Sequence, residues 1–212
     1  MLVSDWMTKN VVTVTPETEV SEALELMLYK GIRRLPVARD RELLGFITLG
    51  DIRQAEGGKS SFVDWDSMDE VSTMPVSRIM SSNPYKISAD ATLEEAAQMM
   101  RNNKVSSLPV VDSYGKLVGI ITQADMMLAF CRMLGSGASG KRLTVTLESG
   151  GEIPRLLRVI ENQGAVVNSL AAAIPAAEAG NRLSVVLRIA ASDIESVLND
   201  LLEHGFKVID IR

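Results

Sequence analysis

The chain has 212 residues, a formal net charge of −5 and 46% hydrophobic residues, enough apolar material to form compact domains. The acidic balance and the lack of long Lys/Arg runs argue against nucleic acid and anionic membrane as partners. The apolar stretches are too short for a membrane helix, a single cysteine excludes an internal disulfide, and no leader pattern precedes the first repeat, so a cytoplasmic location is expected.

The sequence carries two copies of one pattern. The matched blocks are residues 3–10 with 76–83, 35–37 with 108–110, and 45–51 with 119–125. The offset is 73 residues in the first two blocks and 74 in the third, so one inserted residue near Tyr114 explains the drift. Two copies of one unit imply two equivalent surfaces and two equivalent sites.

Each copy is predicted to fold as β-α-β-β-α. A helix is indicated by one-face apolar spacing, at Val20, Ala23, Leu24 and Met27 and again at Leu93, Ala96, Ala97 and Met100. Thr92 with Glu95 predicts a capping box in the second copy. Strands are predicted at residues 35–38, 43–48, 108–111 and 117–122, and closing helices begin near Asp51 and Asp125.

Composition divides the chain further. Residues 56–75 are interpreted as a linker with a short packed segment at Phe62, Val63 and Trp65, between a first repeat at 1–55 and a second at 76–134. Residues 135–140 are rich in Gly and Ser and are predicted to be a flexible joint. Residues 141–212 follow the order β-α-β-β-α-β, which is ferredoxin-like, so the fold class is α+β. The predicted elements of this unit are strands 142–147, 166–173, 182–190 and 207–211 and helices 153–163 and 194–204.

These residues carry a resemblance to known families. The twin blocks resemble a tandem pair of CBS domains, nucleotide-sensing modules, through Met7 and Met80, residues 106–112, and a repeated Gly-x-Ile-Thr-x-x-Asp motif. The C-terminal unit resembles an ACT domain, a small ligand-binding regulatory module, through its strand order and the turn at residues 148–154. The combination resembles the acetoin-utilisation type of bacterial regulatory protein. The first repeat departs from the CBS pattern at residues 33–34 and 38–39.

The repeated Thr-x-x-Asp motif suits a nucleotide. A strand that ends at threonine and turns into a helix exposes backbone amides for an anionic group. The threonine hydroxyl adds a donor for phosphate, and the carboxylate can accept from two neighbouring ribose hydroxyls. The same spacing is also typical of a capping box that only completes the first helical turn, and this alternative stays open.

The CBS resemblance implies two clefts about a pseudo-twofold axis, each with its Thr and Asp from one repeat and its base pocket from the other. One cleft would combine Thr122 and Asp125 with Asn10, Val12, Ile32 and Arg33, and the other Thr48 and Asp51 with Asn83, Tyr85, Val105 and Ser106. Arg33, helped by Arg34, would give the first cleft a permanent positive charge, whereas Ser106 and Ser107 offer neutral hydrogen bonds. Tighter phosphate binding is therefore expected at the Asp125 cleft, unless the two arginines are simply solvated.

The ACT resemblance implies a second ligand site. Backbone amides at Ser149, Gly150 and Gly151 would receive a small carboxylate, with Asn168 and Ser169 as polar neighbours. A plain strand-to-helix turn is the alternative. His204 is the only histidine and stands at a helix end, so no metal set is expected.

The sequence contains no nucleophile–base pair, P-loop or dinucleotide fingerprint. We therefore expect a non-enzymatic regulatory sensor without a cofactor. Its ligand would be AMP, ADP, ATP or S-adenosylmethionine, and the bound state would reach the ACT-like domain or a regulated partner enzyme. The resemblance also implies a homodimer. The alternatives are a scaffold for a partner enzyme with empty clefts and, less favoured, a nucleotide hydrolase.

Overall fold

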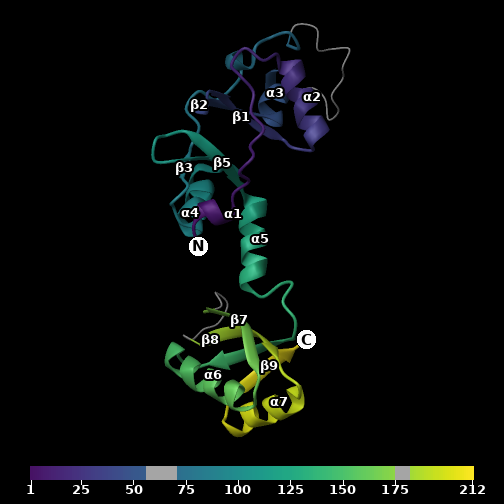
Figure 1. Cartoon of the computed structure of the whole chain (residues 1–212), viewed down its shortest axis with the longest axis vertical. Coiled ribbons are helices and arrows are strands. Elements are labelled where there is room, and N and C mark those ends of the chain that lie inside the picture. The colour runs from purple at the N-terminus through teal and green to yellow at the C-terminus, as the bar shows by residue number, and fades with distance from the viewer. Residues whose placement is uncertain (56–70, 175–181) are drawn as a thin grey trace. The chain divides into compact units, whose positions relative to one another are not determined.

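The computed structural model describes residues 1–55, 71–174 and 182–212, and the chain forms two compact units, Met1–Met126 and Met127–Arg212 (Figure 1). Most of the predicted linker, including Phe62, Val63 and Trp65, lies outside the described residues. Across the described ranges, no helix combines the length and the apolar character that a bilayer span requires.

The first repeat packs two helices against a two-stranded sheet. Helix α2 (Val20–Lys30) is followed by β1 (Arg34–Arg39), β2 (Glu42–Thr48) and α3 (Leu49–Ala55). The four apolar residues of the predicted α2 face are all buried, which confirms the helix and its orientation. The helix ends at Gly31, whose φ of 64° is the left-handed conformation that glycine adopts without strain.

The second repeat confirms the predicted β-α-β-β-α order. Its elements are β3 (Ile87–Ser88), α4 (Leu93–Asn103), β4 (Ser107–Val111), β5 (Leu117–Thr122) and α5 (Gln123–Met133), with sheet order β3-β4-β5. The predicted capping box is present at the start of α4. Thr92 Oγ1 accepts from the Glu95 amide at 3.2 Å, and a Glu95 carboxylate oxygen accepts from the Thr92 amide at 2.7 Å.

The opening strand predicted for the first repeat is very short. It is reduced to one parallel bridge between Val14 and Val37, flanked by two backbone hydrogen bonds. The Thr15 amide donates to Thr18 Oγ1 at 3.0 Å instead of to a neighbouring strand, and Pro16 has no backbone N–H that could pair with one. The local turn therefore ends the strand after a single pair.

The capping box of α4 makes a pH-dependent contribution to stability. Hydrogen bonds from the Thr92 amide and hydroxyl lower the pKa of the exposed Glu95 carboxyl below its ordinary value. The ionised carboxyl is thus favoured by folding, and its contribution is lost as the pH falls through the lowered pKa. We expect the stability advantage of the native chain over Glu95→Gln to shrink between about pH 6 and about pH 3 in urea titrations. An advantage that is the same at both pH values would contradict this assignment.

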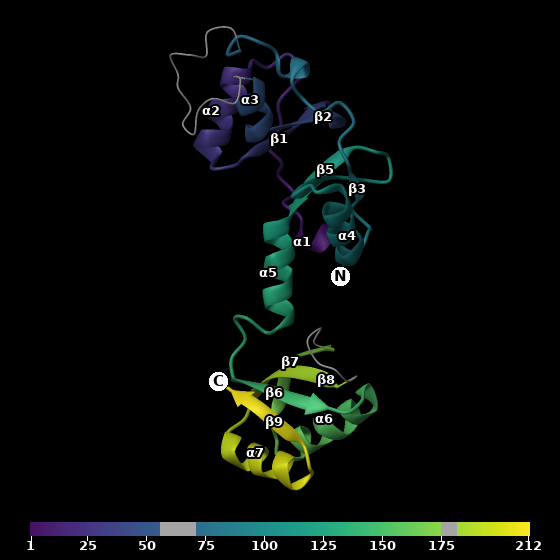
Figure 2. The same cartoon turned by 180° about the vertical axis from the view of Figure 1, so that it is seen from behind.

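The short segments that open each repeat pack on the opposite repeat. Helix α1 (Val3–Trp6) lies beside α4 in both views, and the Val3 amide donates to the Ala91 carbonyl at 2.8 Å (Figures 1 and 2). The 3₁₀ turn η2 (Val76–Arg78) likewise donates from the Val76 amide to the Thr18 carbonyl at 2.9 Å. Residues 1–10, grouped by sequence with the first repeat, therefore belong structurally with the second.

This exchange explains why methionine and glycine recur together in the two copies. A Cβ atom on Gly119 would lie 2.3 Å from Met7 Sδ, and one on Gly45 would lie 2.4 Å from Met80 Sδ. Next to these contacts, Thr8 pairs with Ile120 and Ser81 pairs with Phe46. The methionine of each opening segment thus fills the space over the glycine of the other repeat.

The second unit is a four-stranded antiparallel sheet with two helices. Its elements are β6 (Lys141–Leu147), α6 (Ile153–Asn162), β7 (Val166–Ala173), β8 (Leu183–Ala190), α7 (Ile194–Glu203) and β9 (Lys207–Ile211). The sheet order is β7-β8-β6-β9, and the predicted order β-α-β-β-α-β is confirmed. Alternate strand residues such as Leu143, Val145 and Leu187 form one core with residues of both helices.

Residues 135–140, predicted to be a flexible joint, follow a defined path along the second unit. Asn168 Nδ2 donates to the Ser139 carbonyl at 2.8 Å, and Arg188 Nη1 donates to the Gly140 carbonyl at 3.1 Å. Gly140 has a φ of 106° and passes so close to β8 that a Cβ would lie 2.1 Å from the Ile189 carbonyl oxygen. Gly140 therefore serves a close approach to β8, which composition alone does not reveal.

Candidate functional site

Two cavities lie where the repeats meet in the first unit. The larger, called here the Thr122 cavity, has a volume of about 560 Å³, within the range of small-molecule sites. It is lined by Thr8, Asn10, Val11, Val12, Gly31, Ile32, Arg33, Arg34, Ser106, Ile120, Thr122, Gln123 and Ala124. The smaller, called here the Thr48 cavity, has a volume of about 510 Å³. It is lined by Arg33, Arg34, Thr48, Leu49, Gly50, Arg53 and Ser106.

The Thr122 cavity brings together most of the residues expected at the Asp125 cleft. Thr122 ends β5 of the second repeat, while Val12 and Ile32 come from the first repeat, and all three line this cavity. Asn10 and Arg33 line it as well, with Arg34 beside them, but Asp125, which was expected here, is not among the lining residues. The pairing of Thr8 with Ile120 brings the opening segment against β5 and so carries Asn10 to the cavity.

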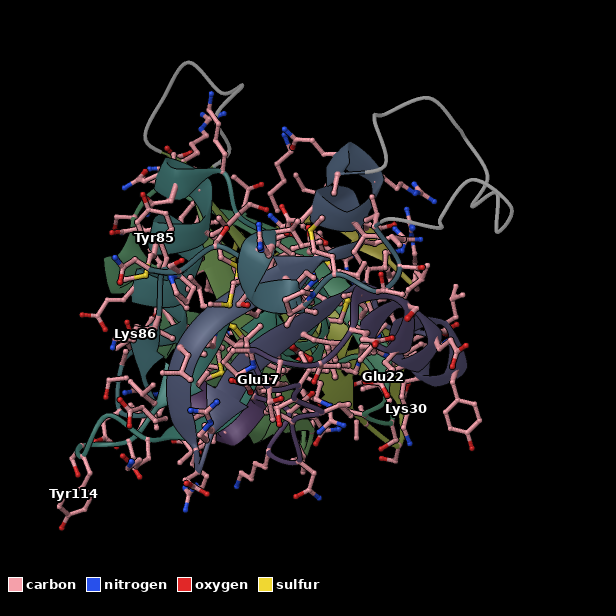
Figure 3. The ribbon with its side chains drawn as sticks, turned by 90° about the horizontal axis from the view of Figure 1, so that it is seen from above. Glu17, Glu22, Lys30, Tyr85, Lys86 and Tyr114 are labelled. Atoms are coloured by element: carbon pink, nitrogen blue, oxygen red, sulfur yellow. The ribbon has the colours of Figure 1, made fainter. Side chains whose placement is uncertain are left out.

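The Thr48 cavity is assembled differently from the prediction. Of the residues expected beside Thr48, only Ser106 lines it, and Asp51, Asn83, Tyr85 and Val105 do not. Asn83 is exposed, and the Tyr85 side chain lies at the surface of the second repeat (Figure 3). Among the described residues, the segment that opens the second repeat pairs with β2 through Ser81 alone, opposite Phe46. The residues that follow Ser81 are therefore not held against Thr48.

Both Thr-x-x-Asp motifs adopt capping-box geometry. Asp51 Oδ2 accepts from the Thr48 amide at 2.7 Å and from its hydroxyl at 2.8 Å, and Asp125 Oδ2 does the same with Thr122 at 2.8 and 2.7 Å. The threonine hydroxyls therefore donate to the aspartates and are not spare donors for a phosphate. The capping bonds use only Oδ2, which leaves Oδ1 of each half-buried carboxylate outside the cap.

The positive charge is shared between the two cavities, contrary to the expected contrast. Arg33 and Arg34 line both, and Arg53 adds a third guanidinium to the Thr48 cavity. Ser107, expected at a cleft, is instead buried in β4, where it pairs with Thr122. Arg33 and Arg34 stand at the start of β1 and belong to both cavity walls, so the sequence pattern did not predict how the charge is distributed.

Arg34 also links the two repeats. Its Nη1 donates to Ser106 Oγ at 2.7 Å, across 72 positions of the sequence. Burial, together with the neighbouring charge of Arg33, lowers the pKa of Arg34, but a guanidinium remains protonated at any physiological pH. The pair Arg34 and Ser106 therefore forms a charged contact that lines both cavities at once.

Arg53 is a cavity residue that sequence reasoning missed. Its equivalent in the second copy, at the offset of 74, is Met127, so a comparison of the repeats could have revealed it. The first-turn residues Gly50 and Ala124 were missed as well, although each follows its threonine by two positions. The second residue of a helix has no intrahelical acceptor for its amide, so these two amides remain available to an anion.

The residues of the expected carboxylate site are not brought together. The Ser149 and Glu148 amides donate to Glu152 Oε2, at 3.4 and 2.7 Å, so they already have a carboxylate partner. Strands β7 and β6 run in the same direction on either side of β8. Asn168 of β7 therefore lies level with the start of β6, whereas Ser149 follows the end of β6. Among the described residues, no group of three or more His, Cys, Asp or Glu side chains could hold a metal ion.

The family model for the CBS domain matches residues 3–58 and 76–132, together more than half of the chain. The chain belongs to the CBS domain family. Both of its repeats are CBS domains, and CBS pairs are regulatory, non-catalytic modules. The twin cavities described above are thus the clefts of a CBS pair.

Curated relatives share this CBS pair. A CBS domain-containing protein of Dictyostelium discoideum is 34% identical over 138 residues, 63% of this chain and 94% of that protein. An inosine-5'-monophosphate dehydrogenase of Korarchaeum cryptofilum is 35% identical over 118 residues, 56% of this chain and 22% of the enzyme. The chain therefore spans about a fifth of the length of that enzyme.

Solved structures of CBS pairs resemble it too. CBSX2 of Arabidopsis thaliana, in complex with AMP, has 30% identity and a TM-score of 0.52, over 62% of this chain and 97% of that one. The CBS pair of protein MJ0100, in complex with 5'-methylthioadenosine and S-adenosyl-L-methionine, has 27% identity and a TM-score of 0.52, over 61% and 95%. A Vibrio cholerae protein named as a candidate acetoin utilization protein (AcuB) has 28% identity and a TM-score of 0.54, over 64% and 93%.

Proposed function

We propose that this protein is a regulatory sensor that binds an adenine nucleotide or a related adenosyl ligand in the Thr122 and Thr48 cavities and does not transform it. The observation that carries the proposal is the placement of both threonines in cavity walls built by the two CBS repeats. Similar CBS pairs are known in complex with AMP and with S-adenosyl-L-methionine, which supports the class of ligand.

The Thr122 cavity offers a distinct place for each part of such a ligand. Val12, Ile32 and Ile120 supply apolar surface for the adenine ring. Asp125 follows the wall residue Ala124, and its Oδ1 is the proposed acceptor for a ribose hydroxyl, since Oδ2 belongs to the helix cap. Arg33 and Arg34 attract the phosphate or other polar end of the ligand.

Transmission of the bound state would start at two features of the cavity wall. A phosphate that pairs with Arg34 competes with Ser106 and so acts on the contact between the repeats. Gln123 and Ala124 line the Thr122 cavity and also begin α5, the helix that leads along the chain into the second unit. A ligand shifts such an arrangement only by its differential affinity for the two states.

We also propose that the second unit is a ferredoxin-like domain of the ACT type that receives this signal. Its element order and its sheet order, with β6 and β8 central, support the assignment. A homodimer, a regulated partner enzyme, a cytoplasmic location and a role in acetoin utilisation remain predictions for this chain. The rival proposal is a scaffold whose cavities stay empty.

Removal of both motif aspartates separates the sensor from the scaffold. In calorimetric titrations with AMP, ATP and S-adenosylmethionine, we expect saturable binding to the native chain and at least a tenfold weaker affinity for Asp51→Ala/Asp125→Ala. Each substitution also removes a helix cap worth about 1 kcal/mol, so ligand-induced thermal shifts are compared with each variant's own melting temperature.

Asp90→Ala is the matched control, because Asp90 is exposed and lines neither cavity. It should bind like the native chain. Equal affinities for the native chain and the double variant would reject the role of the motif, and no binding of any adenosine ligand to the native chain would favour the scaffold. Ligand turnover that depends on one residue of the cavities would instead indicate a hydrolase.

A further inference from the structure

A third cavity lies entirely within the second unit and is strongly cationic. Its volume is about 730 Å³, and among the described residues its wall contains Lys141, Arg142, Arg188 and Arg212 but no acidic side chain. Ala191 and Ile194, both half-buried, supply apolar surface. We call it the β6 cavity, because Lys141 and Arg142 begin that strand. A wall with four basic and no acidic side chains is suited to an anion.

Three of these cations form a row across neighbouring strands. Arg188 of β8 lies directly opposite Arg142 of β6. On the other side, Arg142 and Arg212 exchange two backbone hydrogen bonds, of 2.7 and 2.9 Å. Directly opposite residues of antiparallel strands share one face of the sheet, and like charges in such pairs are destabilising. The row therefore costs stability in the absence of a negative partner.

Nearby acids compensate only part of this charge. Asp210 accepts from Arg142 Nη1 and from Arg212 Nε, each at 3.1 Å, so one carboxylate serves two guanidinium groups. The carboxylate of Asp193, next to Ile194, is used by the amides of Glu195 and Ser196 at the start of α7. Among the described residues, neither Lys141 nor Arg188 has an acidic partner.

Arg188 is held in place by one hydrogen bond, but another of its donors has no partner among the described residues. Its Nη1 donates to the Gly140 carbonyl at 3.1 Å, which fixes the guanidinium beside the cavity wall. Its Nε is buried and has no hydrogen-bond partner within the described residues. A buried donor without a partner costs free energy, and a bound anion near the guanidinium offsets that cost electrostatically.

We propose that the β6 cavity binds a small multivalent anion with phosphate or carboxylate groups and a compact apolar part that contacts Ala191 and Ile194. It would give the sensor a second input, chemically different from the adenosine ligands of the CBS cavities. The site lies at the opposite end of β6 from the Ser149 turn, so it is separate from the carboxylate site that the ACT resemblance implies.

Pyrophosphate and citrate are the probes, titrated into the full chain by calorimetry at constant ionic strength. We expect saturable binding of at least one ion, and an affinity about tenfold weaker in Lys141→Gln, because one charge-assisted contact is lost. Lys207→Gln, an exposed lysine of β9 outside the cavity wall, should bind like the native chain. The tighter of the two ions identifies phosphate or carboxylate as the preferred group.

A second variant separates this site from the CBS cavities, which also contain arginines. Arg33→Gln/Arg53→Gln should retain binding of the ion, and amide NMR signals of Arg142 and Arg188 should shift on titration. Loss of ion binding in that double variant, equal losses in Lys141→Gln and Lys207→Gln, or no saturation below about 1 mM for both ions would each overturn the proposal. Failure of adenosine ligands to bind would leave these results unchanged, so the two proposals are tested independently.

Discussion

Replacement of Gly119 by Ala is expected to destabilise the first unit by roughly 1–3 kcal/mol, the usual cost of overpacking a filled site. The new Cβ would lie 2.3 Å from Met7 Sδ and 2.9 Å from Met7 Cγ, so the methionine must leave its place over β5. Thr8 follows Met7 and lines the Thr122 cavity, so we expect weaker ligand binding as well. Urea unfolding followed by tryptophan fluorescence, from Trp6 and Trp65, measures the change in stability.

A double variant tests the cause. Met7→Ala removes the side chain that the new methyl group would displace, so Gly119→Ala should cost much less in that background, with a coupling energy of about 1 kcal/mol or more. Gly50→Ala is the control, because the nearest contact of its Cβ is an ordinary 3.4 Å. Strictly additive effects of Met7→Ala and Gly119→Ala would show that Met7 does not contact Gly119.

Replacement of Gly140 by Ala is expected to destabilise the second unit by roughly 2–4 kcal/mol, from overpacking together with left-handed backbone strain. The new Cβ would lie 2.1 Å from the Ile189 carbonyl oxygen and 2.6 Å from its carbon, and backbone atoms of a central strand cannot turn aside. Relief requires the segment to move off β8, which breaks the bond from Arg188 to the Gly140 carbonyl. Hydrogen exchange at β6 and β8 amides reports the loss.

Gly137→Ala measures the backbone part of this effect alone, so the difference between the two variants gives the steric part. Gly137 has a φ of 88°, but no atom lies within 4 Å of its Cβ position, so only the cost of the left-handed backbone applies, about 1–2 kcal/mol. Gly140 also lines the β6 cavity, so Gly140→Ala should weaken anion binding, whereas Gly137→Ala should not. Equal destabilisation by the two substitutions would mean that the close approach to Ile189 is absent.

The sequence predicted local features of this chain well, because local chemistry determines them. The spacing of Val20, Ala23, Leu24 and Met27 defines the buried face of α2, and Thr92 with Glu95 defines the start of α4. The element order of the second unit follows from apolar alternation and turns. The twin Thr-x-x-Asp motif also predicted where both strands end and both helices begin.

Contacts between distant segments could not be predicted in the same way. The exchange of residues 1–10 and 76–83 between the repeats depends on pairs such as Thr8 with Ile120, which no local pattern specifies. The position of Arg33 and Arg34 in both cavities follows from how the repeats meet. Likewise, the alignment of Arg142 with Arg188 depends on strand register between residues 46 positions apart.

The aspartates illustrate how two interpretations can both apply. Helix capping and ligand binding were treated as alternatives for Thr-x-x-Asp, yet the structure assigns the cap to one oxygen of each carboxylate. Each aspartate directly follows a residue of a cavity wall, Gly50 or Ala124, and the cap holds its side chain while the other oxygen stays available to a ligand. A capping box and a ribose acceptor are therefore compatible in one residue.

A crystal structure of the full chain grown with excess AMP tests the central claim most directly. We predict ligand density in the Thr122 cavity, with a ribose hydroxyl within hydrogen-bond distance of Asp125 Oδ1 and the phosphate near Arg33 or Arg34. Solvent alone in both CBS cavities, after the same experiment with ATP and S-adenosylmethionine, would contradict the account.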